Sequence, residues 1–220
     1  MLAQASQRNL NLLLSAYLRR NIAGFTVLVC KEVLKHPAEA NEALCELQEQ
    51  ARQIVRVVPA QALVHLRRVR IWLEWENIPN GAAAYHPSAE WLREHGYNPE
   101  KAGGIEINNA RNFVRWSRGE QPWMLLHEMA HAYHHQVLGY DNRAVRIAYR
   151  HALQRGLYER VEYIRGGKQR AYALTNEQEY FAELSEAYFG KNDFFPFVRE
   201  ELARYDPVGF RMMRSMWSEE

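Results

Sequence analysis

The chain has 220 residues, 47% of them hydrophobic, which is enough to bury one substantial core or two lobes that face a cleft. Its 28 Lys and Arg residues nearly balance its 26 Asp and Glu residues, so the formal net charge is only +2. Because this charge creates no strong field, we expect neither nucleic acid nor an anionic membrane surface as a partner. No apolar stretch reaches the roughly 20 residues that a membrane-spanning helix needs, so no integral membrane segment is expected.

The apolar residues 10–18 lack the order of a secretory signal, since Arg19 and Arg20 follow them instead of preceding them. We interpret this stretch as an amphipathic helix. The sequence leaves the compartment open, either cytoplasmic or exported after removal of a signal. A monomer is the favoured oligomeric state.

The first part of the chain, 1–121, is predicted to mix strands and helices. Runs of β-branched and aromatic residues predict strands at 25–30, 70–75, 82–85 and 104–108. Apolar residues at helical spacing predict a helix over 38–57, which Pro59 is expected to end, and a short helix over 88–95.

The second part, 122–220, is predicted to be mainly helical. Its first helix is expected from Pro122, a favoured first-turn residue, to Gly139, a favoured stop. Further elements are expected in the order helix 142–155, hairpin 158–174 with its turn at 166–167, and helices near Thr175, Asp193 and Pro207. Since no repeat or linker composition separates the two parts, we expect one domain over 1–220.

An H-E-x-x-H motif, His127-Glu128-Met129-Ala130-His131, lies inside the helix predicted for 122–139. A spacing of four residues puts both imidazoles on one helix face, where they can share a metal ion. Glu128 lies about 100° from His127 around the helix axis, within reach of a water on that metal. This geometry suits a general base, because zinc lowers the pKa of its bound water and a neighbouring carboxylate takes the proton.

The motif alone would occur by chance in roughly a few per cent of shuffled sequences of this composition. Its helix is apolar on nearly all sides, through Trp123, Leu125, Leu126, Met129, Ala130, Ala132 and Val137, and burial is therefore predicted. Two buried histidines and a glutamate need a shared partner such as a metal ion. We therefore expect one zinc ion per chain.

The position six residues after His131, which carries a third histidine in one class of zinc peptidases, is Val137 here. His135 is one turn beyond His131 and stays open as a ligand, although the third ligand usually comes from a separate element.

A better source is the helix near Thr175, whose start, Thr175-Asn176-Glu177-Gln178, fits a capping box. It carries Glu179 and Glu183 one turn apart, so that one carboxylate could bind the metal while the other accepts the free N–H of a ligating histidine. Glu177 and Glu186 would allow a solvated acidic face instead, but the largely apolar neighbours favour burial.

At this point the sequence resembles the anthrax lethal-factor-like metallopeptidases, a gluzincin group that includes the Pro-Pro endopeptidases. The block HEMAH at 127–131 is common to gluzincins, and the block YALTNEQEYFAE at 172–183 is more specific. Together they span roughly a quarter of the chain, while residues 1–100 contain no motif that aligns.

The resemblance implies that His127, His131 and Glu179 bind zinc and that Glu128 is the general base. It further implies that the Tyr172 hydroxyl stabilises the oxyanion of the tetrahedral intermediate, and that Glu183 supports a zinc ligand by a hydrogen bond.

For the fold, the resemblance implies an α+β zincin-like architecture, with a mixed sheet, a buried HExxH helix and a mainly helical C-terminal half. It also implies an edge strand before that helix, expected at 104–108, that pairs with extended substrate. Most aromatic residues of the first part are expected in the core, including Trp72, Trp75, Tyr85, His86 and Trp91.

We therefore predict a zinc metalloendopeptidase that hydrolyses peptide or protein substrates. The alternative is a non-catalytic, zinc-stabilised domain that binds peptides or proteins. Structural zinc sites usually fill all four positions with protein ligands, whereas this chain offers three ligands plus water, which favours the enzyme.

Overall fold

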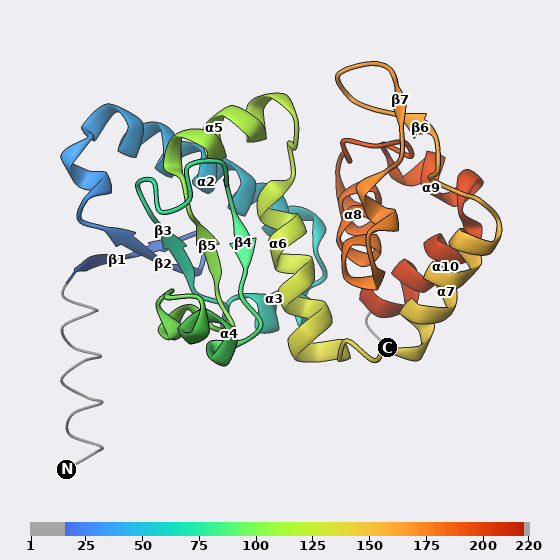
Figure 1. The fold of residues 1–220 in the computed structure, drawn as a ribbon, viewed down its shortest axis with the longest axis horizontal. Coiled ribbons are helices and arrows are strands. Elements are labelled where there is room, and N and C mark those ends of the chain that lie inside the picture. The colour runs from blue at the N-terminus through green and yellow to red at the C-terminus, as the bar shows by residue number, and fades with distance from the viewer. Residues whose placement is uncertain (1–15, 218–220) are drawn as a thin grey trace, which may run out of the picture.

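A computed structural model describes residues 16–217 (Figure 1). The fold is α+β: a mixed five-stranded sheet and its helices form the first part, and a group of helices forms the second. Figure 1 shows helix α6 (Met124–Tyr133) between these two parts. The prediction of an α+β fold with a mixed sheet is confirmed.

The sheet consists of β1 (Tyr17–Ile22), β2 (Phe25–Cys30), β3 (Ile71–Leu73), β4 (Ala84–Tyr85) and β5 (Ile105–Ile107), in the order β1-β2-β3-β5-β4. The three central strands are parallel, and β1 and β4 pair antiparallel at the two edges. All four predicted strands therefore exist.

The strand expected at 104–108 exists as β5, but the prediction that it forms an edge of the sheet is wrong. Strand β5 is hydrogen-bonded on both sides, by β3 and by β4, and all three of its residues are buried. The edge next to α6 is β4, because the chain after β3 folds back and pairs antiparallel outside β5. Sequence alone could not show this order, since both segments are short apolar runs.

Most of the helix expected at 10–18 lies outside the described residues, and its last two residues belong to strand β1. The turn Ala23-Gly24 has positive φ at both residues, 52° and 92°, as in the two-residue hairpin turns whose twist matches the strands. Pairing with the buried strand β2 thus decides the structure of this segment.

The other helical elements are η1 (Val33–Lys35), α2 (Pro37–Val57), α3 (Ala60–Leu66), α4 (Ala89–Glu94), η2 (Pro99–Lys101), α5 (Ala110–Gly119), η3 (His134–Leu138), α7 (Arg143–Gln154), η4 (Tyr172–Leu174), α8 (Glu177–Phe189), α9 (Arg199–Tyr205) and α10 (Pro207–Trp217). Pro59 does follow the end of α2, but it also begins α3, which the sequence did not predict, and α5 was missed as well. Among the helices within residues 16–217, none combines the length and apolarity needed to cross a membrane.

The helix expected near Asp193 begins only at Arg199. The preceding segment pairs with the hairpin of β6 (Val161–Glu162) and β7 (Lys168–Gln169), because the Ile164 N–H donates to the Asp193 carbonyl and the Phe195 N–H to the Glu162 carbonyl. These main-chain bonds hold the segment in an extended form.

One face of the sheet belongs to the main hydrophobic core, and the opposite face carries a buried charged network. Lys101 Nζ lies 2.7 Å from Glu74 Oε1 and also contacts Glu106, whose second oxygen lies 2.7 Å from His86 Nε2. Burial alone would raise the pKa of Glu106, but the hydrogen bond with His86 and the charge of Lys101 lower this pKa to about 2. Glu106 is therefore held as a carboxylate within the sheet.

Replacing this carboxylate is predicted to make unfolding less pH-dependent. Because the pKa falls from 4.5 to about 2 on folding, the carboxylate contributes about 3 kcal/mol above pH 4.5, and this contribution is lost as the pH falls toward 2. Glu106→Gln should therefore lower the unfolding free energy at pH 7 by about 3 kcal/mol, and the difference from wild type should shrink below pH 4.5. Urea unfolding between pH 7 and pH 3 measures this.

The matched control is Glu76→Gln, which breaks an exposed ion pair with Arg111. It should change the unfolding free energy by less than about 1 kcal/mol at any pH. Equal pH profiles of wild type and Glu106→Gln would contradict the role assigned to Glu106.

Candidate metal centre

The three polar residues of the HExxH motif lie in the middle of helix α6, where the surrounding side chains are buried and apolar. His127 is 3% exposed and Glu128 8% exposed, and His131 is only slightly more accessible. Helix α6 packs on one side against α8 and on the other against the sheet edge β4. The motif thus sits at the contact between the two parts of the molecule, and its polar groups need partners there.

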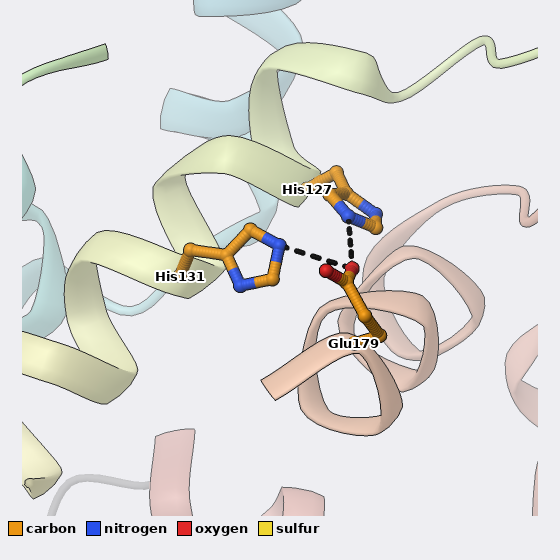
Figure 2. A group of neighbouring side chains, drawn as sticks. All are labelled: His127, His131 and Glu179. Carbon is orange, nitrogen blue, oxygen red and sulfur yellow. Dashed lines mark hydrogen bonds and ion pairs between the residues drawn. The ribbon is translucent and has the colours of Figure 1, made fainter. Parts of the chain in front are cut away.

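Helix α8 supplies the partner for both histidines (Figure 2). Nε2 of His127 lies 3.1 Å from Glu179 Oε2, and Nε2 of His131 lies 3.2 Å from the same oxygen. The two imidazoles point from α6 toward the carboxylate on α8. Residues 52 positions apart in sequence are thereby brought to one point.

The first turn of α8 fixes the position of Glu179. Its N-cap is Asn176, whose side chain accepts a hydrogen bond of 2.8 Å from the Glu179 N–H. The expected capping box at Thr175 is therefore wrong by one residue, because Thr175 still belongs to the end of the turn η4. Asn is as good an N-cap as Thr, which explains why the sequence did not separate the two.

These three side chains fit a divalent metal ion. Their potential ligand atoms lie within 4.8 Å of one another. Ligand bonds of roughly 2.0–2.2 Å in a tetrahedral site place ligand atoms about 3.3 to 3.6 Å apart, close to the distances of 3.1 and 3.2 Å found here. Two imidazole nitrogens and a carboxylate oxygen form a donor set suited to zinc among other transition metals.

The charges at this point favour binding of a cation. Burial alone would raise the pKa of Glu179, but its hydrogen bonds with His127 and His131 lower this pKa far below 4.5, so the carboxylate stays ionised. Burial alone would lower the pKa of His127, but its bonds with Glu179 and Glu186 raise it well above 6.5. A metal ion would have to displace a proton from this histidine, as metal ligation by imidazole generally requires.

A second carboxylate, Glu186, lies behind His127. Its Oε1 lies 2.7 Å from His127 Nδ1, the nitrogen that faces away from Glu179. Glu183, expected in this role from the sequence, has its nearest oxygen 3.9 Å from Nδ1, too far for a hydrogen bond. The group that orients His127 is therefore Glu186.

Three buried acids, Glu183, Glu186 and Asp193, lie close to His127, and burial opposes a negative charge on each of them. Burial, together with Asp193 and Glu186, raises the pKa of Glu183 well above 4.5, which favours its neutral form. Burial also raises the pKa of Asp193, to about 7. Burial raises the pKa of Glu186 as well, but the hydrogen bond and the charge of His127 act in the opposite direction, and Glu186 lies closest to Nδ1. Its spacing from Glu179 and Glu183, at seven and three residues, was a signal that all three share one helix face.

His127, Glu183 and Glu186 also have potential ligand atoms within 4.8 Å of one another. This second group shares His127 with the first, and a histidine that binds metal through Nε2 keeps its proton on Nδ1. We therefore assign Glu186 to orienting the histidine and not to a separate metal site.

A cleft of about 590 Å³ opens over the candidate centre. Its walls include His127, Glu128, His131 and Glu179, with Tyr172 on one side and β4 on the other. Oε2 of Glu128 accepts a hydrogen bond of 2.7 Å from the Tyr85 main-chain N–H. The carboxylate of Glu128 is thus held between the sheet edge and the candidate metal ligands, and it is not part of the group that could hold the ion.

Tyr172 lies in the turn η4 and its side chain is half exposed at the cleft. Its ring centroid is 6.5 Å from that of His127. Burial and the charge of Glu179 raise the pKa of its hydroxyl above 10, so the phenol keeps its proton at neutral pH. The structure therefore brings Tyr172 to the same cleft as the other predicted site residues.

His135, which the sequence left open as a metal ligand, points elsewhere. Its Nδ1 lies 2.7 Å from the Tyr85 hydroxyl, and its ring stacks on Tyr140. His134 is fully buried against Tyr140 and Phe181, and burial lowers its pKa to about 4, so it is neutral.

A scan against protein-family models, a search of curated proteins and a search of solved structures found no match for this chain. The resemblance to the lethal-factor-like metallopeptidases therefore stays a prediction from two sequence blocks.

Zinc affinity is predicted to depend on Glu186 more than on Glu183. Glu186→Gln removes the carboxyl group that lies 2.7 Å from Nδ1 and should weaken zinc binding roughly tenfold or more. Glu183→Gln changes a side chain whose oxygen lies 3.9 Å from Nδ1, beyond hydrogen-bond distance, and should change affinity less than about threefold. Competition against a zinc chelator at pH 7 measures both, and a larger loss for Glu183→Gln would contradict the assignment.

Proposed function

We propose that this protein is a gluzincin-type zinc metalloendopeptidase with a zincin-like fold. The observation that carries the proposal is the convergence of His127, His131 and Glu179 on one point, with the Glu128 carboxylate beside it in an open cleft. The sequence blocks at 127–131 and 172–183, which resemble this class, support the same proposal.

His127, His131 and Glu179 would hold the ion, one per chain, and leave a position open to the cleft. Bound zinc supplies a Lewis acid that polarises a carbonyl group and acidifies water. This three-residue donor set is typical of catalytic zinc, because structural zinc sites usually use four protein ligands, commonly thiolates.

Glu128 is the group suited to move the proton. Its Oε2 is held by the Tyr85 N–H, which leaves Oε1 available to a water molecule in the cleft. The carboxylate accepts a proton as the water oxygen bonds to the scissile carbonyl carbon. It then returns this proton to the amide nitrogen as the C–N bond breaks.

Tyr172 is suited to stabilise the charge that develops on the carbonyl oxygen. Its raised pKa keeps the hydroxyl protonated at neutral pH, so it can donate a hydrogen bond. The half-exposed side chain can approach a substrate without first breaking a hydrogen bond recorded among the described residues.

The sheet edge β4 would bind the substrate main chain. The Asn108 N–H donates to the Ala82 carbonyl and the His86 N–H to the Gly104 carbonyl, both at 3.0 Å, at the two ends of β5, so the main-chain groups of Ala83 and Tyr85 point away from the sheet. The Tyr85 N–H is engaged by Glu128, which leaves the Tyr85 carbonyl and both main-chain groups of Ala83 for a substrate. An extended peptide can add to this edge by main-chain hydrogen bonds beside the ligands.

Glu128→Gln is predicted to separate catalysis from metal binding. The amide keeps the shape of the side chain but cannot take a proton, so hydrolysis should fall at least about a hundredfold. Zinc content, measured by elemental analysis, should stay at one ion per chain, because Glu128 is not in the ligand group. Hydrolysis is measured on a mixed peptide library by mass spectrometry.

The control is Glu177→Gln in the first turn of α8, outside the cleft, which should keep hydrolysis within about twofold of wild type. A zinc-loaded wild type that cleaves no peptide, and behaves like Glu128→Gln, would sink the peptidase proposal and favour a zinc-stabilised binding domain. A folded wild type that takes up no zinc would contradict both.

Tyr172→Phe is predicted to lower kcat about a hundredfold with little change in KM, because the lost hydrogen bond forms only as charge develops on the carbonyl oxygen. Tyr133→Phe is the control: this tyrosine lies on α6, but its hydroxyl donates to the Met216 carbonyl. If Tyr172→Phe raises KM and leaves kcat unchanged, the residue serves substrate binding instead.

A further inference from the structure

A second cavity, of about 420 Å³, adjoins the cleft across strand β4. Both cavities are lined by Ala84, Tyr85 and Pro87, so they meet along this strand. The remaining lining of the second cavity is Ile78, His86, Ser88, Trp91 and Tyr97. Its volume falls within the range of about 300–1,000 Å³ that is usual for ligand pockets.

The wall of this cavity is aromatic and accessible. Trp91 is 48% exposed and Tyr97 37% exposed, so the expected burial of Trp91 in the core is wrong. The two rings are nearly parallel, with centroids 5.9 Å apart and an angle of 8°, and Trp91 also stacks on His95 at 4.0 Å. Stacking on both neighbours fixes the indole, which leaves a rigid apolar surface open to solvent.

Two polar side chains in the lining, His86 and Ser88, are already engaged within the protein. His86 Nε2 lies 2.7 Å from Glu106, and Ser88 Oγ accepts the Trp91 N–H as the N-cap of α4. No Lys, Arg, Asp or Glu is among the lining residues. The cavity therefore suits an uncharged, apolar group.

Strand β4 determines how a bound peptide would reach both cavities. Ala84 pairs directly with Glu106, and His86 bonds to Glu106, so these side chains share the face that holds the second cavity. Tyr85 points to the opposite face, where its hydroxyl bonds to His135 beside α6. A peptide paired with β4 places alternate side chains on these two faces.

We propose that the cavity of Trp91 and Tyr97 is a specificity subsite that receives one aromatic or large aliphatic side chain of the substrate strand paired with β4. This inference rests on the proposed peptidase function and adds the substrate class to it. The subsite lies on the sheet face opposite α6. It therefore receives one side chain of the bound peptide, and the two adjacent side chains of that peptide point to the face of the candidate metal centre.

The test compares two libraries of synthetic peptides with blocked termini. Both have random sequences and differ only in whether they contain large apolar residues. One set contains Phe, Tyr, Trp, Leu, Ile and Met, and the other carries Ala and Ser in their place. Zinc-loaded wild type, Trp91→Ala, Trp91→Phe and the control Ile147→Ala, an exposed residue on α7, are each assayed for cleavage by product sequencing. Binding of both sets to zinc-loaded Glu128→Gln is measured in parallel, with and without Trp91→Ala.

Wild type should prefer a large apolar residue at one fixed distance from the cleaved bond, by about tenfold or more in kcat/KM over Ala. Trp91→Ala should abolish this preference, whereas Trp91→Phe and Ile147→Ala should keep it. Cleavage without any fixed apolar position, or with a preference that Trp91→Ala leaves unchanged, would overturn the subsite while the peptidase function stands.

The binding arm separates the two proposals. If wild type cleaves neither set, but the apolar set binds to Glu128→Gln more tightly than the Ala and Ser set and loses this advantage with Trp91→Ala, the peptidase proposal fails and the peptide subsite stands. Equal binding of both sets, unaffected by Trp91→Ala, would overturn the subsite in that case as well.

Discussion

The packing of α6 against α8 is the contact on which the candidate centre depends. The two helices run antiparallel, since Trp123 before α6 meets Gly190 after α8, while His131 near the other end of α6 meets Glu179. A Cβ on Gly190 would lie 2.0 Å from the Trp123 ring, so only glycine permits this close approach. The approach brings two histidines and three glutamates into an otherwise apolar contact.

Polar groups buried in this way need partners, and His127 has one on each ring nitrogen. Glu179 engages one nitrogen and Glu186 the other. The histidine is therefore fixed in orientation from both sides, as expected for a metal ligand whose ring must not rotate. Glu128 is fixed separately, by a main-chain N–H of the sheet, so its position does not depend on the hydrogen bonds of the candidate metal ligands.

Strand β4 has only two residues, yet it links three features of the proposed function. Its Tyr85 N–H holds Glu128, the other outward main-chain groups at this edge can pair with a peptide, and its two faces border the cleft and the aromatic cavity. The buried network of Lys101, Glu106 and His86 supports this strand from the neighbouring β5. The charged network thereby helps to position the uncharged strand β4, which borders both cavities.

Sequence by itself determined the features that depend on local spacing. The four-residue interval of His127 and His131 fixed their common face, and the block around Glu179 pointed to the third member of the group, which the structure brings to the same point. The strands at 25–30 and 71–73 followed from their apolar runs, because burial on both faces requires such runs.

Tertiary structure alone decided which elements become neighbours. Strand order made β4 the edge instead of β5, and pairing with β2 made Tyr17 and Leu18 part of a strand, because hydrogen bonds between distant segments override local preference. The choice of Glu186 over Glu183 beside His127 depends on a difference of about an ångström between two side chains on the same helix face. Periodicity assigns a helix face but cannot resolve such a distance, which is set by the packing of α6 on α8.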